Sequence, residues 1–188
     1  MKTKIILDLC GGTGAWSKPY KDAGYDVRNI TWPEYEIGSY RPPKSVYGIL
    51  AAPPCTMFSL ARTTAKIPRN LDMGMVLVKV CMNIIWKTKP KFWALENPKG
   101  LLRKFLGKPA FEFDASEFGS NYNKHTDLWG YFKEPKKTTE YKRYNSTDKN
   151  TRKLPQLPDG YEYIGSKISA RRAITPAGFA KAFYKANK

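Results

Sequence analysis

The fold is indicated most clearly by the segment Lys4-Ile5-Ile6-Leu7-Asp8-Leu9-Cys10-Gly11-Gly12-Thr13-Gly14. In it an apolar run leads through one acid into a cluster of glycines. Such a run is typical of a buried parallel strand that ends in a turn facing a ligand. Glycines in that turn let the backbone approach a ligand closely and leave amide groups free at the start of the next helix. The turn is neither a GxGxxG fingerprint nor a P-loop, and a plain strand-to-helix turn is the alternative interpretation.

Strands and helices alternate along the rest of the chain. The hydrophobic pattern predicts further strands over 25–30, 46–51 and 91–95. Helices are expected over 15–23, 72–88, 98–106 and from 176 onward. Asp72 and Asn97 are the expected N-caps of the second and third helices, Gly107 ends the third, and the second is expected to be buried on most faces. This order predicts an α/β fold, a doubly wound, mostly parallel sheet with helices on both faces.

Composition narrows the class of protein. The 188 residues include 33 Lys and Arg against 16 Asp and Glu, a formal net charge of +17 at pH 7. This excess favours a polyanionic partner such as nucleic acid, with an anionic membrane surface or simple solubility as the alternatives. No apolar run is long enough to span a membrane, and the first nine residues do not form a signal peptide. Three cysteines without a CxxC pair and a single histidine argue against a zinc site and a Ser-His-Asp triad, so we expect no metal and a reducing, cytoplasmic compartment.

Reactive side chains follow three of the expected strands, whose carboxyl ends meet at one edge of a parallel sheet. Asp8 ends the first strand, Cys55 lies in the turn after the third, and Glu96 ends the next. Pro53-Pro54 stiffens the turn before Cys55, and a thiol beside free amides in a positive field is expected to have a lowered pKa and to act as a nucleophile. A small buried hydrophobe is the alternative for Cys55, and a helix-cap carboxylate is the alternative for Glu96.

The order and spacing of these motifs resemble those of the DNA cytosine-5 methyltransferases. Residues 8–14 are similar to that family's cofactor loop, Pro53-Pro54-Cys55 with Phe58-Ser59 to its nucleophile loop, and Glu96-Asn97 to its catalytic motif. Residues 118–126 are similar to the family's FGxPQxRxR stretch, and residues 172–176 to its closing motif. The resemblance implies a Rossmann-like fold that uses S-adenosylmethionine.

Methyl transfer to cytosine C5 of DNA, through a covalent bond between Cys55 and cytosine C6, is the activity that the resemblance implies. It implies that Glu96 hydrogen-bonds the base, that Asn97 holds the Cys55 loop, and that Lys124 takes the place of the family's first arginine, whereas Tyr122 and Thr126 depart from the family pattern. It also implies that Trp32 stacks on the adenine of the cofactor and that Glu36 replaces the family's acid that follows the third strand and meets the adenine amino group. The full set of implied cofactor-binding residues is Asp8, Leu9, Cys10, Gly11, Gly12, Gly14, Trp32, Glu36 and Pro53.

A large target-recognition region is what this chain lacks relative to the family. We expect a catalytic core over 1–132, a short basic insertion over 133–166 in place of that region, and a C-terminal helix over 167–188 that returns to the core. Eight basic and three acidic side chains over 133–153 favour binding to a DNA backbone largely without regard to sequence, with a solvated loop as the alternative. The expected nucleic-acid contacts are Ser59, Arg62, Lys136, Lys137, Lys142, Arg143 and Arg172.

Three alternatives stay open at this point. The first is the same methyl transfer on RNA instead of DNA. The second is a non-catalytic relative that only binds nucleic acid, although it has no use for Cys55 and Glu96 together. The third is a subunit that borrows its target recognition from a separate partner. The small size is typical of a phage or mobile element, which would place the protein in the cytoplasm of a bacterial host.

Overall fold

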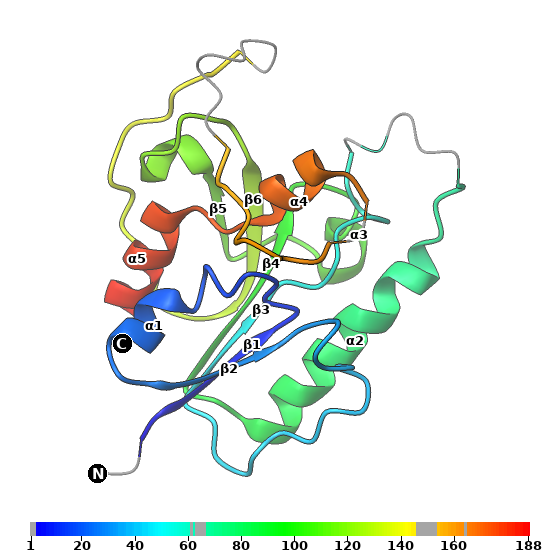
Figure 1. Ribbon diagram of the computed structural model, residues 1–188, viewed down its shortest axis with the longest axis vertical. Helices are drawn as coiled ribbons and strands as arrows, with labels where there is room; N and C mark the ends of the chain where they lie inside the picture. Colours follow the sequence, from blue (N-terminus) through cyan, green and yellow to red (C-terminus); the bar gives the residue numbers. More distant parts are fainter. Residues whose placement is uncertain (1–2, 61, 63–66, 146–153, 164) are drawn as a thin grey trace.

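A twisted sheet runs through the centre of the molecule (Figure 1). The computed structural model describes residues 3–60, 62, 67–145, 154–163 and 165–188, and within them six strands form one sheet in the order β2-β1-β3-β4-β6-β5. The strands are β1 (Ile5–Leu9), β2 (Asp26–Ile30), β3 (Gly48–Ala51), β4 (Phe92–Pro98), β5 (Phe111–Asp114) and β6 (His125–Tyr131). The first four are parallel, and β6 runs antiparallel to both β4 and β5. The predicted doubly wound, mostly parallel sheet is therefore confirmed.

Helices cover both faces of the sheet, as predicted. Side chains alternate along a strand, so Leu7 of β1 faces α2 (Leu71–Thr88), whereas Ile6 faces α1 (Lys18–Asp22) and α5 (Ala177–Ala186). The shorter helices are α3 (Arg103–Leu106), the 3-10 helix η1 (Ala115–Phe118) and α4 (Lys167–Ala173). Phe179 and Phe183 of α5 are fully buried on one face, as the sequence predicts, and Phe179 stacks on Phe113 with ring centroids 4.1 Å apart. This contact brings the end of the chain back onto the sheet.

Helix α2 differs from the prediction at its start and in its burial. Its N-cap is Asn70, whose side chain accepts a hydrogen bond from the Met73 amide at 2.9 Å, so the expectation that Asp72 is the cap is wrong. Met73 and Val76 are 64% and 49% exposed, so the helix buries one face and leaves apolar side chains on the other. The sequence overestimates burial here because apolar residues on an outer face look the same as core residues in a hydrophobic pattern.

Strand β4 runs further than predicted. Asn97 and Pro98 lie in the strand, opposite Asp127 and Thr126 of β6, and do not open a helix. Helix α3 is correspondingly short, although Gly107 does end it. Pairing with a strand about 30 residues away overrides the local helix signal, which is a weak predictor when tertiary pairing competes. Helix α1 is also shorter than the expected 15–23.

The expected basic insertion has no helix or strand over its described residues 133–145 and 154–163. The first part is bound to η1, because the amides of Thr138 and Thr139 donate to the Glu117 carbonyl oxygen at 3.0 and 3.1 Å. Residues 146–153 and 164 of the insertion lie outside the described residues. Within the described part of the chain, we find no helix with the length and hydropathy needed to cross a membrane.

Candidate active site

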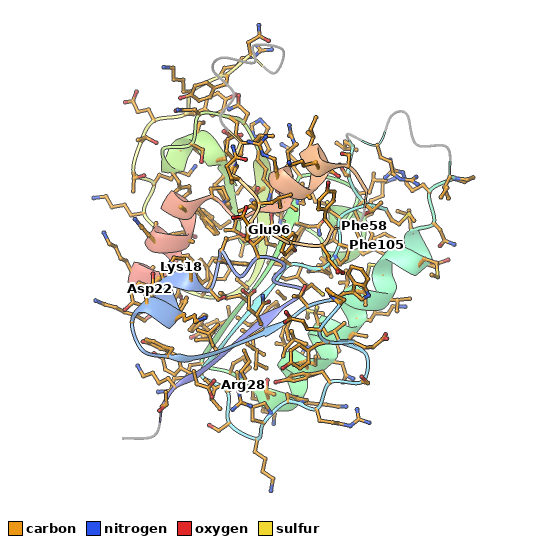
Figure 2. The ribbon with its side chains drawn as sticks, in the orientation of Figure 1. Lys18, Asp22, Arg28, Phe58, Glu96 and Phe105 are labelled. Carbon is orange, nitrogen blue, oxygen red and sulfur yellow. The ribbon has the colours of Figure 1, made fainter. Side chains whose placement is uncertain are left out.

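The ends of three parallel strands meet at one edge of the sheet. Leu9 of β1 pairs with Ala51 of β3, and Ala51 pairs with Leu95 of β4, so the residues that follow these positions lie side by side. They are the glycine turn, the Cys55 turn and Glu96, and Figure 2 shows Glu96 near the centre of the molecule. The convergence that the sequence predicts is thus a feature of the structure.

The turn that carries Cys55 is held in place by buried contacts. Asn97 is fully buried, and its side-chain nitrogen donates to the Pro53 carbonyl oxygen at 2.9 Å. The amides of Phe58 and Ser59 both donate to the Cys55 carbonyl oxygen at 2.9 Å. These bonds fix the backbone on either side of the thiol, while Cys55 itself stays partly accessible.

A buried ion pair stands beside Cys55. The Lys124 ammonium lies 3.1 Å from Glu96 Oε1, and the two side chains are 8% and 10% exposed. Both charges act on the Cys55 thiol: the Glu96 carboxylate raises its pKa and the Lys124 ammonium lowers it. The site therefore joins a nucleophile candidate, a carboxylate and a cation, and the sequence did not predict the pairing of the last two.

The pKa of Cys55 is raised, so the prediction of a lowered value is wrong for the free protein. Burial is the largest cause, followed by the Glu96 carboxylate, and both outweigh the opposing effect of Lys124. The sequence shows the positive net charge of the chain, but it does not show that the Cys55 thiol is buried beside the Glu96 carboxylate. At neutral pH the free protein holds Cys55 as a thiol.

The glycine turn forms a cradle over a buried acid. Asp8 is fully buried and accepts a hydrogen bond from the Ser17 hydroxyl at 2.5 Å, while its other oxygen, Oδ1, has no hydrogen-bond partner among the described residues. Burial raises the pKa of Asp8 to about 6. A Cβ on Gly11 would overlap the Asp8 carboxyl group, and Gly12 has a φ of +55°, which favours glycine. An unsatisfied acceptor beneath a bare backbone fits a cofactor that carries donor groups.

The other residues expected to bind the cofactor differ in how far their side chains are exposed. Trp32 is 56% exposed directly after β2, where it is free to stack on a ring. Glu36 is exposed in the connection between β2 and β3. The side chain of Leu9 is fully buried in the core, and the Cys10 thiol contacts that of Cys81. Leu9 and Cys10 can therefore reach a cofactor only through their backbone. The Pro53 carbonyl oxygen accepts a hydrogen bond from the Asn97 side chain, as described above.

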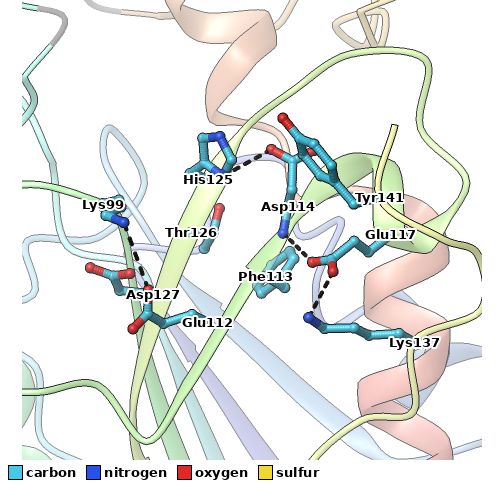
Figure 3. A pocket seen from close by; sticks show the side chains of 10 residues that line it. All are labelled: Lys99, Glu112, Phe113, Asp114, Glu117, His125, Thr126, Asp127, Lys137 and Tyr141. Carbon is cyan, nitrogen blue, oxygen red and sulfur yellow. Dashed lines mark hydrogen bonds and ion pairs between the residues drawn. The ribbon is translucent and has the colours of Figure 1, made fainter. Parts of the chain in front are cut away.

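The expected nucleic-acid residues do not form one continuous group with Cys55. Lys136, Lys142 and Arg143 are exposed on the segment bound to η1. Lys137 instead pairs with Glu117 at 2.7 Å beside a separate cavity of about 240 Å³ at the edge of β5 and β6 (Figure 3).

Three more of the expected nucleic-acid residues interact within the protein. Arg62 donates to the Ile67 carbonyl oxygen at 2.7 Å, and the Ser59 carbonyl oxygen accepts a hydrogen bond from Arg69. Burial raises the pKa of Tyr122, and the nearby Arg172 has a smaller effect in the opposite direction. Over the described residues, no group of three or more His, Cys, Asp or Glu is arranged to hold a metal.

Sequence analysis missed three residues of the site. Ser17 binds Asp8, Asn29 donates to the Gly12 carbonyl oxygen at 2.9 Å, and the Tyr161 hydroxyl lies over Gly12. None of them stands in a motif. The only signal for Ser17 is a hydroxyl residue at the start of the helix after the glycine turn, and Asn29 stands out only as a polar residue near the end of a buried strand.

The strand order and the helices on both faces of the sheet define an α/β fold of the Rossmann-like class. Residues 25–128 match the family model of C-5 cytosine-specific DNA methylase, and the chain belongs to this family. The match includes Cys55, Glu96, Asn97 and Lys124, and it begins after the glycine turn.

Among the solved structures that are similar in part is one described as a candidate DNA modification methyltransferase encoded within an E. coli prophage. Its sequence identity to this chain is 16% and the TM-score is 0.49. The similarity covers 69% of this chain and 47% of the other, so this chain spans about half the length of that protein. A search of curated proteins gave no match.

Proposed function

We propose that this protein transfers a methyl group from S-adenosylmethionine to C5 of cytosine in DNA, through a covalent bond between Cys55 Sγ and cytosine C6. The observation that supports it best is the cluster of Cys55 with the buried Glu96–Lys124 pair, next to the glycine cradle. A buried acid and a buried amine are costly to keep in a protein that only binds a nucleic acid backbone. Their position beside a thiol is what a reaction at a base requires.

The three side chains have complementary roles in this proposal. Cys55 Sγ bonds to C6 of the ring, which makes C5 electron-rich, and the Sγ–C6 bond breaks again when C5 loses its proton. Glu96 accepts a hydrogen bond from the exocyclic amine. It also takes the proton that leaves the Cys55 thiol and donates it to N3, where negative charge develops as the bond to C6 forms. The Lys124 ammonium holds the carboxylate in place and stabilises the Cys55 thiolate when it forms. Asn97 fixes the Pro53 carbonyl and with it the approach of the thiol.

Residues of the cradle are the proposed cofactor site. Asp8 Oδ1 would accept a hydrogen bond from the cofactor, the backbone at Gly11, Gly12 and Gly14 would lie against it, and Trp32 would stack on its adenine. When bound, S-adenosylmethionine supplies an electrophilic methyl carbon. The pairing of β1 with β3 supports this assignment, since it sets the cradle directly beside the Cys55 turn.

DNA is the proposed partner, bound mainly through its backbone. A base inside a stacked duplex cannot reach Cys55, so the target is flipped out or single-stranded. The exposed side chains of Lys136, Lys142 and Arg143 are the proposed phosphate contacts, on the insertion over 133–166 that stands in place of a recognition domain. With so short an insertion, a separate recognition subunit is a further proposed partner. The proposed compartment is the bacterial cytoplasm, where DNA and cofactor meet.

Nucleoside mass spectrometry tests the proposal. DNA and total RNA are digested from cells that express the wild-type chain or the Cys55→Ala variant. We expect 5-methyldeoxycytidine in DNA only with the wild-type chain. Methylated cytidine in RNA alone would move the activity to RNA, and no modified nucleoside in either would favour a protein that only binds nucleic acid.

A further inference from the structure

A segment of the expected insertion crosses the carboxyl edge of the sheet. Residues 154–161, which we call the strap, run ahead of α4 and are coloured orange in Figure 1. One end of the strap lies near Lys124 and the other lies over the glycine cradle, as the contacts below show. The strap thus reaches both halves of the proposed site.

The first end of the strap is firmly anchored. Leu154 is 7% exposed and packs against Ala115 and Tyr122. Tyr122 precedes Lys124 by two residues in the chain. Arg171 of α4 donates from Nε to the Pro155 carbonyl oxygen at 2.7 Å and from Nη2 to the Leu154 carbonyl oxygen at 2.5 Å. Hydrogen bonds from a guanidinium are stronger than neutral ones, so this end has a defined position.

Tyr161 is at the other end, after a turn in which its amide donates to the Pro158 carbonyl oxygen at 3.2 Å. Its hydroxyl lies 3.1 Å from the point that a Cβ on Gly12 would occupy. Burial raises the pKa of Tyr161, so the hydroxyl is protonated at neutral pH and can donate. The hydroxyl stands over the bare backbone that a ligand would approach.

An acceptor and a donor therefore lie next to two adjacent glycines. Asp8 Oδ1, an acceptor without a partner among the described residues, lies against Gly11, and the Tyr161 hydroxyl, a donor, lies over Gly12. A ligand that fits both needs a donor and an acceptor close together. The amino-acid group of S-adenosylmethionine, with an ammonium and a carboxylate on one carbon, has this pattern.

We propose that Tyr161 is a cofactor-binding residue whose hydroxyl donates to the carboxylate of the amino-acid group, an inference that rests on the proposed function. The strap would then serve the cofactor site, although the sequence assigns its region to nucleic acid. The side chain would add a donor to a cradle whose other described side chain, Asp8, supplies an acceptor.

Isothermal titration calorimetry with S-adenosylhomocysteine, an unreactive product, tests this role. Loss of one hydrogen bond in Tyr161→Phe is expected to raise Kd about fivefold, and Tyr161→Ala to raise it by more than about tenfold. Tyr163→Phe is the matched control, since Tyr163 is 42% exposed two residues further along, and its Kd is expected to change less than about twofold. 5′-Deoxy-5′-methylthioadenosine lacks the amino-acid group, so Tyr161→Phe and the wild-type protein are expected to bind it equally.

Several results would overturn the inference. Equal affinity of the wild-type protein and both Tyr161 variants for S-adenosylhomocysteine would show that the hydroxyl makes no contact. Tighter binding by Tyr161→Ala would show that the side chain obstructs the cradle. If the wild-type protein does not bind S-adenosylhomocysteine at all, the cofactor assignment in the proposed function is itself wrong, and the inference fails with it. Thermal unfolding of Tyr161→Phe verifies that the variant is folded.

Discussion

Asp8→Asn tests the cradle through stability as well as binding. The rise of the Asp8 pKa from its usual 3.8 to about 6 reflects the cost of burying its charge. At about 1.36 kcal/mol per pKa unit, ionisation of Asp8 destabilises the folded protein by about 3 kcal/mol at pH 7. Asparagine is neutral and keeps an oxygen for the Ser17 hydroxyl. We therefore expect the variant to be more stable than the wild-type protein at neutral pH, by up to about 3 kcal/mol.

The pH dependence of this difference has a definite sign. Between pH 3.8 and about 6, the folded protein keeps a proton on Asp8 that the unfolded chain has lost. This group's contribution to stability therefore falls as the pH rises through that window and is constant above it. The gap between Asp8→Asn and the wild-type protein should be near zero below the window and reach its full size above about pH 6.

Urea unfolding at a series of pH values, followed by tryptophan fluorescence, measures this gap. Asp22→Asn is the matched control, because Asp22 is exposed and pairs only with Lys18 on the surface of α1, so its loss should cost less than about 0.5 kcal/mol. An Asp8→Asn variant less stable than the wild-type protein at pH 7, or a gap that does not change with pH, would refute the reasoning. The same variant should bind S-adenosylhomocysteine more weakly, since it loses the charged acceptor.

Three further predictions concern the reactive cluster and the basic segment. Lys124→Met leaves the Glu96 carboxylate buried without its cation and should lower the free energy of unfolding, measured with urea, by about 3 kcal/mol. Adding Glu96→Gln should restore most of this stability. No recovery in the double variant would contradict the ion-pair account. Because the pKa of Cys55 is raised, its alkylation by iodoacetamide, mapped by peptide mass spectrometry, should keep accelerating above pH 9, and a plateau below pH 8 would contradict this. The DNA-binding constant falls with salt, and Lys142→Ala should reduce the steepness of log K against the logarithm of the salt concentration by about one. Lys137→Ala should change this slope less, because Lys137 pairs with Glu117. Equal effects of the two variants would refute the distinction.

The sequence predicts those residues of the site whose position is set by the carboxyl end of a parallel strand. Asp8, Cys55 and Glu96 each follow an apolar run, and parallel strands bring their carboxyl ends to one edge whatever else the chain does. Local pattern is enough for this result. It is also enough for the helix at the end of the chain, whose phenylalanines recur at helical spacing.

Features that depend on distant pairing are not visible in the sequence. Asn97 followed by Pro98 has the local pattern of a helix start, but pairing with β6 keeps both in a strand. Lys124 meets Glu96 because β6 returns antiparallel beside β4. Burial of Cys55 and the nearby Glu96 carboxylate, which also depend on tertiary packing, raise the pKa of Cys55 against the expected direction. Tyr161 lies in a segment without periodicity, and only the anchoring of Leu154 by Arg171 brings the strap over the cradle.

Covalent trapping tests the central claim most directly. A single-stranded oligonucleotide with 5-fluorocytosine is incubated with the protein and S-adenosylmethionine, because fluorine at C5 cannot leave as the proton does and the bond to C6 then persists. Intact-protein mass spectrometry should show the mass of one oligonucleotide added, and peptide mapping should place it on Cys55. The account predicts no adduct with Cys55→Ala. An adduct on another residue, or none with the wild-type protein under conditions where it binds both ligands, would contradict it.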